Sequence, residues 1–153
     1  MSGLRSDYLK DLSNLCLSDF SDVVPCDKLS VLTQGDKYIC NLDPSNEKGS
    51  HYIAVSIKKD YCLYFDSYGF PCMNEYIKKA FLENDITALY YSKKSIQSSF
   101  SLFCGYFSLA FLIYDECGLS MDEFQNLFDD KNLKRNEKVA ADIIKISIAK
   151  LNM

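Results

Sequence analysis

The sequence predicts a single α+β domain in which a small, mostly antiparallel sheet packs around one buried central helix. Three observations lead to this class. The chain has 153 residues, 48% hydrophobic and 25% charged, which is the composition of one globular domain with its own core. Short runs rich in β-branched and aromatic residues alternate with turn residues. The apolar run Leu102–Tyr114 is too short to span a bilayer and predicts a core helix. We assign residues 1–153 to one domain.

The N-terminal half is expected to form one helix followed by strands. Ser6–Leu17 carries apolar residues at helical spacing, which predicts a short helix. Val23–Asp27 is expected to be a loop, because its proline disfavours helix at the preceding residue. The predicted strands of this half are Lys37–Leu42, His51–Ile57 and Tyr61–Phe65.

The C-terminal half is expected to be mainly helical. The pattern predicts a helix over Asn74–Glu83, a strand over Ile86–Tyr91, a polar loop over Ser92–Ser101, and then the apolar helix, which runs to Glu116 and stops at Gly118. Ser120 and Glu123 form a capping box for the next helix. That helix carries Phe124, Leu127 and Phe128 on one side. A last helix over Asn136–Leu151 places Val139, Ile143, Ile146 and Ala149 on one face.

Charge and cysteine content limit the partners and the compartment. The net charge of −4 gives no global basic field, so nucleic acid is a weak default partner. The seven cysteines are odd in number and lack a C-x-x-C pair, and the polar N-terminus has no secretory h-region, so we expect a reducing interior. We assign all cysteines except Cys104 to packing, and we expect no metal site and no cofactor, because one histidine and scattered thiols provide no ligand cluster.

His51 is the only histidine, so acid-base chemistry that needs an imidazole near neutral pH must use it. If the pair Lys58-Lys59 forms a two-residue hairpin loop, His51 lies directly opposite Asp66 on the same face. A three-residue loop would place Ser67 opposite His51 instead. The alternative is that His51 is a half-buried strand residue and that Asp66 starts a turn.

Cys104 stands where the polar loop becomes the apolar helix. A thiol in the first turn of a helix lies at the positive end of its dipole, which favours the nucleophilic thiolate, and Gly105 leaves room for a substrate. Gln97 can supply an amide donor that, with the backbone N–H of Cys104, binds the oxyanion of a tetrahedral intermediate. The alternatives are a packed core thiol and an exposed loop glutamine.

These residues also carry a resemblance to a known family. The resemblance rests on the order His51, Asp66, Gln97, Cys104 and on the phrases Gly49-Ser-His-Tyr52, Tyr64-Phe-Asp-Ser-Tyr-Gly69 and Cys104-Gly-Tyr106. In these features the chain resembles the adenovirus maturation protease (adenain) family, including the adenovirus-like cysteine proteases of Maverick/Polinton elements and virophages. The resemblance covers most of the chain, from the N-terminal helix and the stretch Val24–Leu29 to Asn136-Glu137. Phe103 stands where SUMO-deconjugating proteases typically have aspartate, which favours the viral branch.

The resemblance implies that Cys104 is the nucleophile, His51 the general base, Asp66 the acidic orienting residue and Gln97 the oxyanion donor. It implies an adenain-type papain-like fold in which the central helix starts at the nucleophile. The implied function is a cysteine endopeptidase that processes viral or mobile-element capsid precursors during virion maturation. It would act in the virion and in the host-cell cytoplasm or virus factory.

Partners and alternative functions follow from the same comparison. The adenoviral enzyme is activated by DNA and by a disulfide-linked peptide, but the acidic charge of this chain does not favour DNA binding. We expect a monomer that acts on protein substrates away from membranes. The first alternative is a ubiquitin-like or SUMO-like deconjugating protease or a host-directed effector on the same fold. The second is an inactive structural or binding module, against which the presence of all four chemical groups speaks.

Overall fold

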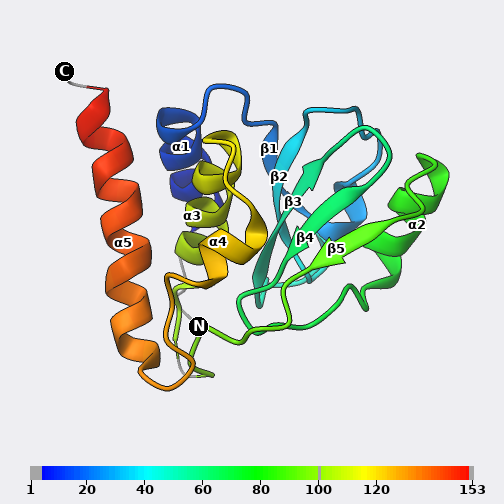
Figure 1. Cartoon of the computed structure of the whole chain (residues 1–153). Coiled ribbons are helices and arrows are strands. Elements are labelled where there is room, and N and C mark those ends of the chain that lie inside the picture. Colours follow the sequence, from blue (N-terminus) through cyan, green and yellow to red (C-terminus); the bar gives the residue numbers. More distant parts are fainter. Residues whose placement is uncertain (1–4, 100, 152–153) are drawn as a thin grey trace.

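The computed structural model describes residues 5–99 and 101–151, over which the chain forms five α-helices, one 3₁₀ helix and five strands (Figure 1). The helices are α1 (Ser6–Cys16), α2 (Glu75–Glu83), α3 (Cys104–Glu116), α4 (Met121–Gln125) and α5 (Leu133–Lys150), with the 3₁₀ helix η1 at Cys26–Lys28. The strands are β1 (Asp22–Pro25), β2 (Lys37–Asn41), β3 (Tyr52–Ile57), β4 (Cys62–Phe65) and β5 (Leu89–Tyr91). None of the helices over these residues is long and apolar enough to cross a membrane.

The sheet has the strand order β1-β2-β3-β4-β5. The central pairs β2–β3 and β3–β4 are antiparallel, whereas the outer pairs β1–β2 and β4–β5 are parallel. The described sheet is therefore mixed, and the prediction of a mostly antiparallel sheet is wrong at both edges. The combination of helices with a mixed sheet is compatible with the predicted α+β class.

The strand β1 was predicted to be a loop, and this prediction is wrong. Val23 pairs with Ile39 and Val24 with Cys40 in a parallel ladder. Proline lacks an N–H donor and is tolerated at the end of an edge strand, so Pro25 does not prevent pairing. The valines, which favour extended backbone, determine the local structure here.

Different helices bury the two faces of the sheet. Along β3, Ala54 belongs to the core beneath α3, whereas Ile53 and Val55 belong to the core beneath α2, as the period-two alternation of a strand requires. α3 packs against β3, and α5 packs against α3 (Figure 1). The sheet is thus covered by α2 on one face and by α3 and then α5 on the other.

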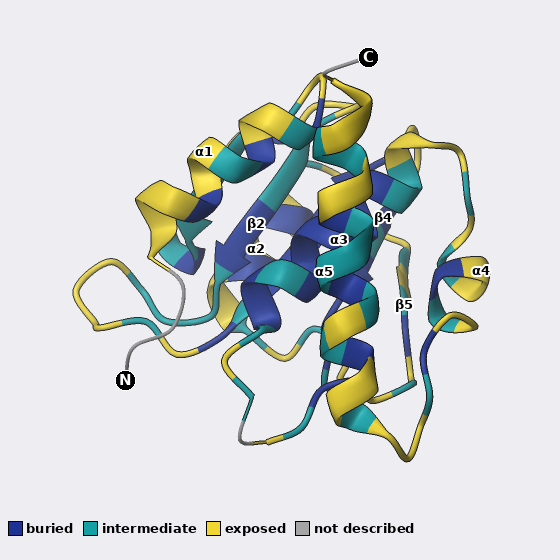
Figure 2. Cartoon of the chain, turned by 90° about the vertical axis from the view of Figure 1, so that its left-hand side faces the viewer, coloured by how far each residue is buried: buried dark blue, intermediate teal, exposed yellow. Residues whose placement is uncertain are grey.

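The central helix α3 is buried on nearly every side, as its sequence predicts. The residues from Cys104 to Ile113 are all buried except Tyr106. Figure 2 shows α3 behind α5, whose outer face is exposed. The capping box at the start of α4 is also confirmed, because Ser120 and Glu123 make both of its hydrogen bonds.

The last helix is confirmed, but its predicted face is only half right, because Val139 and Ile143 pack against the core while Ile146 and Ala149 do not. The buried residues of α5 are Asn136, Ala140 and Ile144, whereas Ile146 is 57% exposed and Ala149 is also exposed. The buried positions are spaced by four and form one helical row. Asn136 is polar and Ala140 is small, so an apolar pattern does not mark the centre of the buried row. Leu127, predicted to lie on the apolar side of the preceding helix, is exposed too.

The hairpin between β3 and β4 has a longer loop than predicted. Ile57 pairs with Cys62 and not with Asp60, so four residues connect the strands. The predicted register, with His51 directly opposite Asp66, is therefore wrong. The observed register differs from the predicted one by two residues. Because strand faces alternate with period two, Asp66 still lies on the face predicted for it. The two residues remain diagonal neighbours at the same end of the hairpin.

Candidate active site

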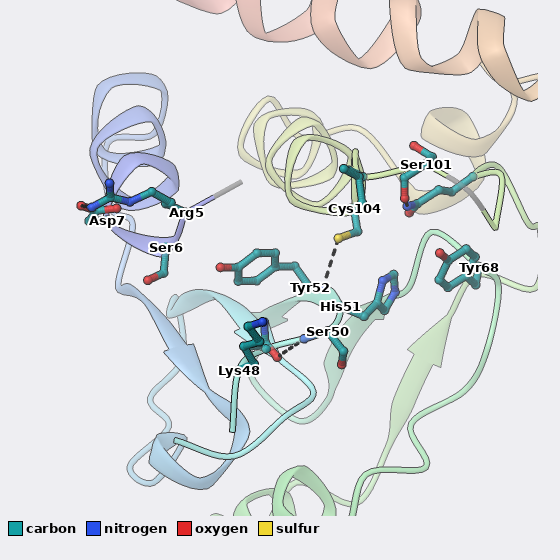
Figure 3. Close-up of a pocket in the computed structure, with 14 residues that line it drawn as sticks. Arg5, Ser6, Asp7, Lys48, Ser50, His51, Tyr52, Tyr68, Ser101 and Cys104 are labelled. Carbon is teal, nitrogen blue, oxygen red and sulfur yellow. Dashed lines mark hydrogen bonds and ion pairs between the residues drawn. The ribbon is translucent and has the colours of Figure 1, made fainter. Parts of the chain in front are cut away.

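A cleft of about 410 Å³ opens where β3 and α3 both begin (Figure 3). Residues from the start of α1 lie at one end of the cleft, and Tyr68, from the loop after β4, lies at the other. His51, Gln97 and Cys104 all line it. The remaining lining residues are Arg5, Ser6, Asp7, Asn41, Lys48, Gly49, Ser50, Tyr52, Ser101 and Leu102.

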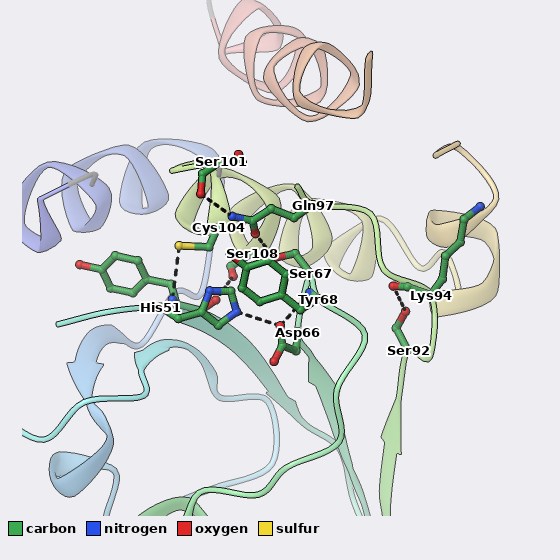
Figure 4. Close-up of polar contacts among 11 residues, drawn as sticks. His51, Asp66, Ser67, Tyr68, Ser92, Lys94, Gln97, Ser101, Cys104 and Ser108 are labelled. Atoms are coloured by element: carbon green, nitrogen blue, oxygen red, sulfur yellow. Dashed lines mark hydrogen bonds and ion pairs between the residues drawn. The ribbon is translucent and has the colours of Figure 1, made fainter. Parts of the chain in front are cut away.

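The predicted contact between His51 and Asp66 is present. His51 directly precedes β3 and Asp66 directly follows β4, so both lie at the same end of the sheet. His51 Nε2 lies 2.8 Å from Asp66 Oδ1, and both residues are buried (Figure 4). The same oxygen accepts a hydrogen bond of 2.8 Å from the backbone N–H of Tyr68. A carboxylate fixed in this way orients the imidazole and leaves its Nδ1 atom for the thiol.

Cys104 is the first residue of α3 and is 8% exposed. Its Sγ atom accepts a hydrogen bond of 3.5 Å from the backbone N–H of Tyr52. The first amides of a helix have no partner within the helix and carry its partial positive charge, which stabilises an anionic sulfur. The prediction that this thiol lies at the start of the buried helix is confirmed, and Cys104 also lines the cleft.

The histidine and the thiol shift each other's pKa in opposite directions. Burial alone would lower the pKa of His51, but its hydrogen bonds and charge interactions with Asp66 and Cys104 raise it to about 9. Burial would raise the pKa of Cys104, but the hydrogen bond and the charge of His51 outweigh this and hold it below its usual range. Both shifts favour an imidazolium beside a thiolate, which is the activated form of a cysteine nucleophile.

Gln97 is 2% exposed, which contradicts the alternative of an exposed loop glutamine. Its Nε2 atom donates to the carbonyl oxygen of Ser101 at 3.0 Å, and its Oε1 atom accepts from the hydroxyl of Ser67 (Figure 4). A carboxamide nitrogen has two N–H groups. One is therefore left for a group bound in the cleft beside Cys104.

Tyr68 also belongs to this site, although no sequence pattern predicted it. The Tyr68 ring stacks on the His51 ring, with centroids 4.5 Å apart and an interplanar angle of 22°. It covers one face of the imidazole, while its backbone N–H binds Asp66. The sequence offers only a weak indication of this role. Tyr68 stands two positions after Asp66, and the two side chains would lie on the same face only if the backbone stayed extended.

The turn after β4 joins the acid to the loop that carries Gln97. The N–H of Gly69 donates to the carbonyl oxygen of Asp66 at 2.8 Å, and Gly69 has a φ of +79°. A Cβ atom on Gly69 would lie 2.7 Å from the carbonyl oxygen of Lys93. Glycine is needed here both for the left-handed backbone and for the close approach of the two segments.

The other cysteines have different surroundings. Cys26, Cys40 and Cys62 are buried and Cys16 and Cys72 partly buried, as the assignment to packing predicts, but Cys117 is exposed, so that assignment is wrong for Cys117. Burial raises the pKa of each of the five covered thiols, that of Cys62 to about 12. Residues 5–99 and 101–151 contain no group of three or more His, Cys, Asp or Glu side chains placed to hold a metal ion.

Comparison with models of known protein families gave no match to this chain, and a search of curated proteins found no relative.

Proposed function

We propose that this chain is a cysteine endopeptidase in which Cys104 is the nucleophile. One observation carries the proposal: His51 interacts with both Asp66 and Cys104, in a cleft that Gln97 also lines. Acyl transfer by a thiol needs an activated sulfur, an oriented proton carrier and a donor for the oxyanion. The four side chains provide these groups within one site.

In the proposed mechanism the Cys104 thiolate attacks the carbonyl carbon of a peptide bond. The developing oxyanion accepts hydrogen bonds from Gln97 Nε2 and from the backbone N–H of Cys104. The imidazolium of His51 donates its Nδ1 proton to the leaving amine, which departs and leaves a thioester. Water, deprotonated by His51, then hydrolyses the thioester and restores the thiol, while Asp66 holds the ring throughout.

The resemblance to the adenain family supports capsid or other precursor proteins of a virus or mobile element as the substrate class. The cleft is open to solvent and extends past His51 to the start of α1, and a second hollow of about 220 Å³ continues it along β1. Tyr52 and Lys48 line both hollows. Two adjoining hollows that share lining residues offer room for successive residues of an extended polypeptide.

The test is cleavage by the purified chain, with Cys104→Ala as the matched control. Candidate precursor proteins and a proteome-derived peptide library are incubated with each form, and new N-termini are identified by mass spectrometry. We expect cleavage by the wild-type chain and none by the variant. Equal cleavage by both forms would reject Cys104 as the nucleophile. Exclusive reaction with ubiquitin or SUMO probes that carry a C-terminal electrophile would replace the endopeptidase with a deconjugating protease.

A further inference from the structure

The mechanism above leaves one buried hydroxyl of the site without a role. Ser67 follows Asp66 directly, is 0% exposed, and donates the hydrogen bond that Gln97 Oε1 accepts. It therefore touches the proposed oxyanion donor but does not line the cleft. A buried hydroxyl that contacts a functional amide and no substrate is placed to determine how that amide is oriented.

The hydrogen-bond partners of Gln97 determine which end of its carboxamide faces which way. The carbonyl oxygen of Ser101 can only accept, so the amide nitrogen must lie on that side, at 3.0 Å. The hydroxyl of Ser67 must then donate to Oε1. If the carboxamide were turned by 180°, its oxygen would face the oxygen of Ser101 and the cleft. The site would then offer an acceptor where the mechanism needs a donor.

The backbone of Ser67 holds the same loop. Its carbonyl oxygen accepts the N–H groups of Ile96 at 2.9 Å and of Gln97 at 3.2 Å. On the other side, Asn136 Nδ2 donates to the carbonyl oxygen of Ile96 at 3.0 Å, which ties the loop to α5. The backbone position of Gln97 is thus fixed independently of the Ser67 side chain. Removal of the hydroxyl should therefore release the amide orientation and leave the loop in place.

We propose that Ser67 is a positioning residue that keeps the Nε2 end of Gln97 directed into the cleft. Its place next to Asp66 means that one turn sets the orientation of both the histidine and the oxyanion donor. The inference rests on the proposed function for its catalytic consequence. The Ser67–Gln97 contact can be tested without catalysis.

The kinetic test is a double-mutant cycle with Ser67→Ala and Gln97→Ala. Loss of an oxyanion donor lowers kcat by roughly 10²- to 10³-fold, and we expect Ser67→Ala alone to lower kcat by about 10-fold or more, with KM within about twofold. In the Gln97→Ala background, Ser67→Ala should cause no further loss, because it acts through Gln97. The proposal is overturned if Ser67→Ala leaves kcat unchanged or lowers it equally in both backgrounds.

Ser56→Ala is the matched control. Ser56 is also a buried serine, and its hydroxyl donates to the Asp115 carboxylate at 2.6 Å, away from the cleft. We expect Ser56→Ala to leave kcat within about twofold. We also expect Ser67→Ala to leave the alkylation rate of Cys104 unchanged, because alkylation needs the thiolate but no oxyanion donor. A parallel loss of alkylation and kcat would mean that Ser67 acts on the fold or the ion pair, against the proposal.

A third measurement uses the wild-type chain and needs no substrate. Nuclear Overhauser effects between the Gln97 side-chain amide protons and their neighbours report the carboxamide orientation. We expect contacts to Ser101 and none to the Ser67 β-protons, and the reverse pattern overturns the proposal. If the wild-type chain cleaves no peptide, the proposed function fails, yet loss of this pattern in Ser67→Ala would still show that Ser67 sets the Gln97 orientation, and an unchanged pattern would overturn the proposal.

Discussion

The two sides of the sheet contain buried cysteines that differ sharply in their surroundings. Cys40 and Cys62 lie in the core beneath α2 and are 0% exposed, and burial raises the pKa of both. Cys104, on the α3 side, is nearly as buried, but it lies at a helix start beside His51, which lowers its pKa. Burial alone therefore does not distinguish an inert thiol from a reactive one. The two kinds of thiol differ in whether a histidine lies beside the sulfur and in whether the cysteine begins a helix.

The largest expected effect comes from removing the Cys104 thiol and, in a separate variant, the Cys40 thiol. Cys104→Ala should lower kcat/KM for a cleaved peptide by about 10⁴-fold or more, with the free energy of unfolding within about 1 kcal/mol of wild type. Cys40→Ala should do the opposite. It leaves kcat/KM within about twofold but destabilises the fold by about 1 to 2 kcal/mol, because it opens space in a packed core. Peptide hydrolysis and urea unfolding measure both effects, and an inactive Cys40→Ala variant of normal stability would break the comparison.

The next effect concerns the carboxylate that orients His51. Asp66→Asn should lower kcat/KM by roughly 10²- to 10⁴-fold, because an amide group facing Nε2 no longer stabilises the imidazolium. Asp115 is the matched control, since its side chain is also covered, being 5% exposed, and binds Ser56 and Lys58 at the far end of α3. Asp115→Asn should destabilise the fold and leave kcat/KM within a few-fold. Similar kinetic losses in both variants would show that burial of a carboxylate, and not its contact with His51, matters.

The turn that joins the acid to the Gln97 loop gives a smaller effect on stability. Gly69→Ala combines a left-handed φ of +79° with a clash against the Lys93 carbonyl oxygen, whereas Gly118 has a φ of +81° and open space around its Cβ position. Gly118→Ala should destabilise by about 1 kcal/mol and Gly69→Ala by about 2 to 4 kcal/mol. Urea unfolding of the two variants checks this. Equal losses would indicate that the turn and the loop are not in close contact.

The smallest effect is the pH dependence of hydrolysis. The rate should rise with pH as Cys104 ionises, since its pKa lies below the usual range. It should fall again as pH passes about 9, where His51 loses the proton that the leaving amine requires. The fall approaches about tenfold per pH unit. A profile of kcat/KM from pH 5 to pH 10 measures both limbs, and a rate that keeps rising beyond pH 9 contradicts the ion pair.

Much of the site could be predicted because each chemical group is rare or marked by a pattern. One histidine limits the base to a single residue, and the change from polar loop to apolar run marks Cys104. The face shared by His51 and Asp66 survived an incorrect register, because the error was two residues and strand faces alternate with period two.

The remaining features depend on contacts that sequence patterns do not encode. The parallel pairing of β1 joins segments with no hairpin between them, so no turn signal announces it. The buried row of α5 includes Asn136, which is buried because its amide binds Ile96 and Asp129 carbonyl oxygens. Tyr68 reaches His51 only because the turn at Gly69 folds as it does.

The most direct test of the central claim is the alkylation of the intact chain by iodoacetamide at pH 6, resolved by peptide mass spectrometry. Exposure alone would favour Cys117, which is exposed, over the buried Cys104. We predict that Cys104 is nevertheless labelled first and that His51→Ala abolishes its advantage, because the imidazolium holds the thiolate. Labelling of Cys104 no faster than Cys16, Cys72 or Cys117 would contradict an activated thiol at the head of α3.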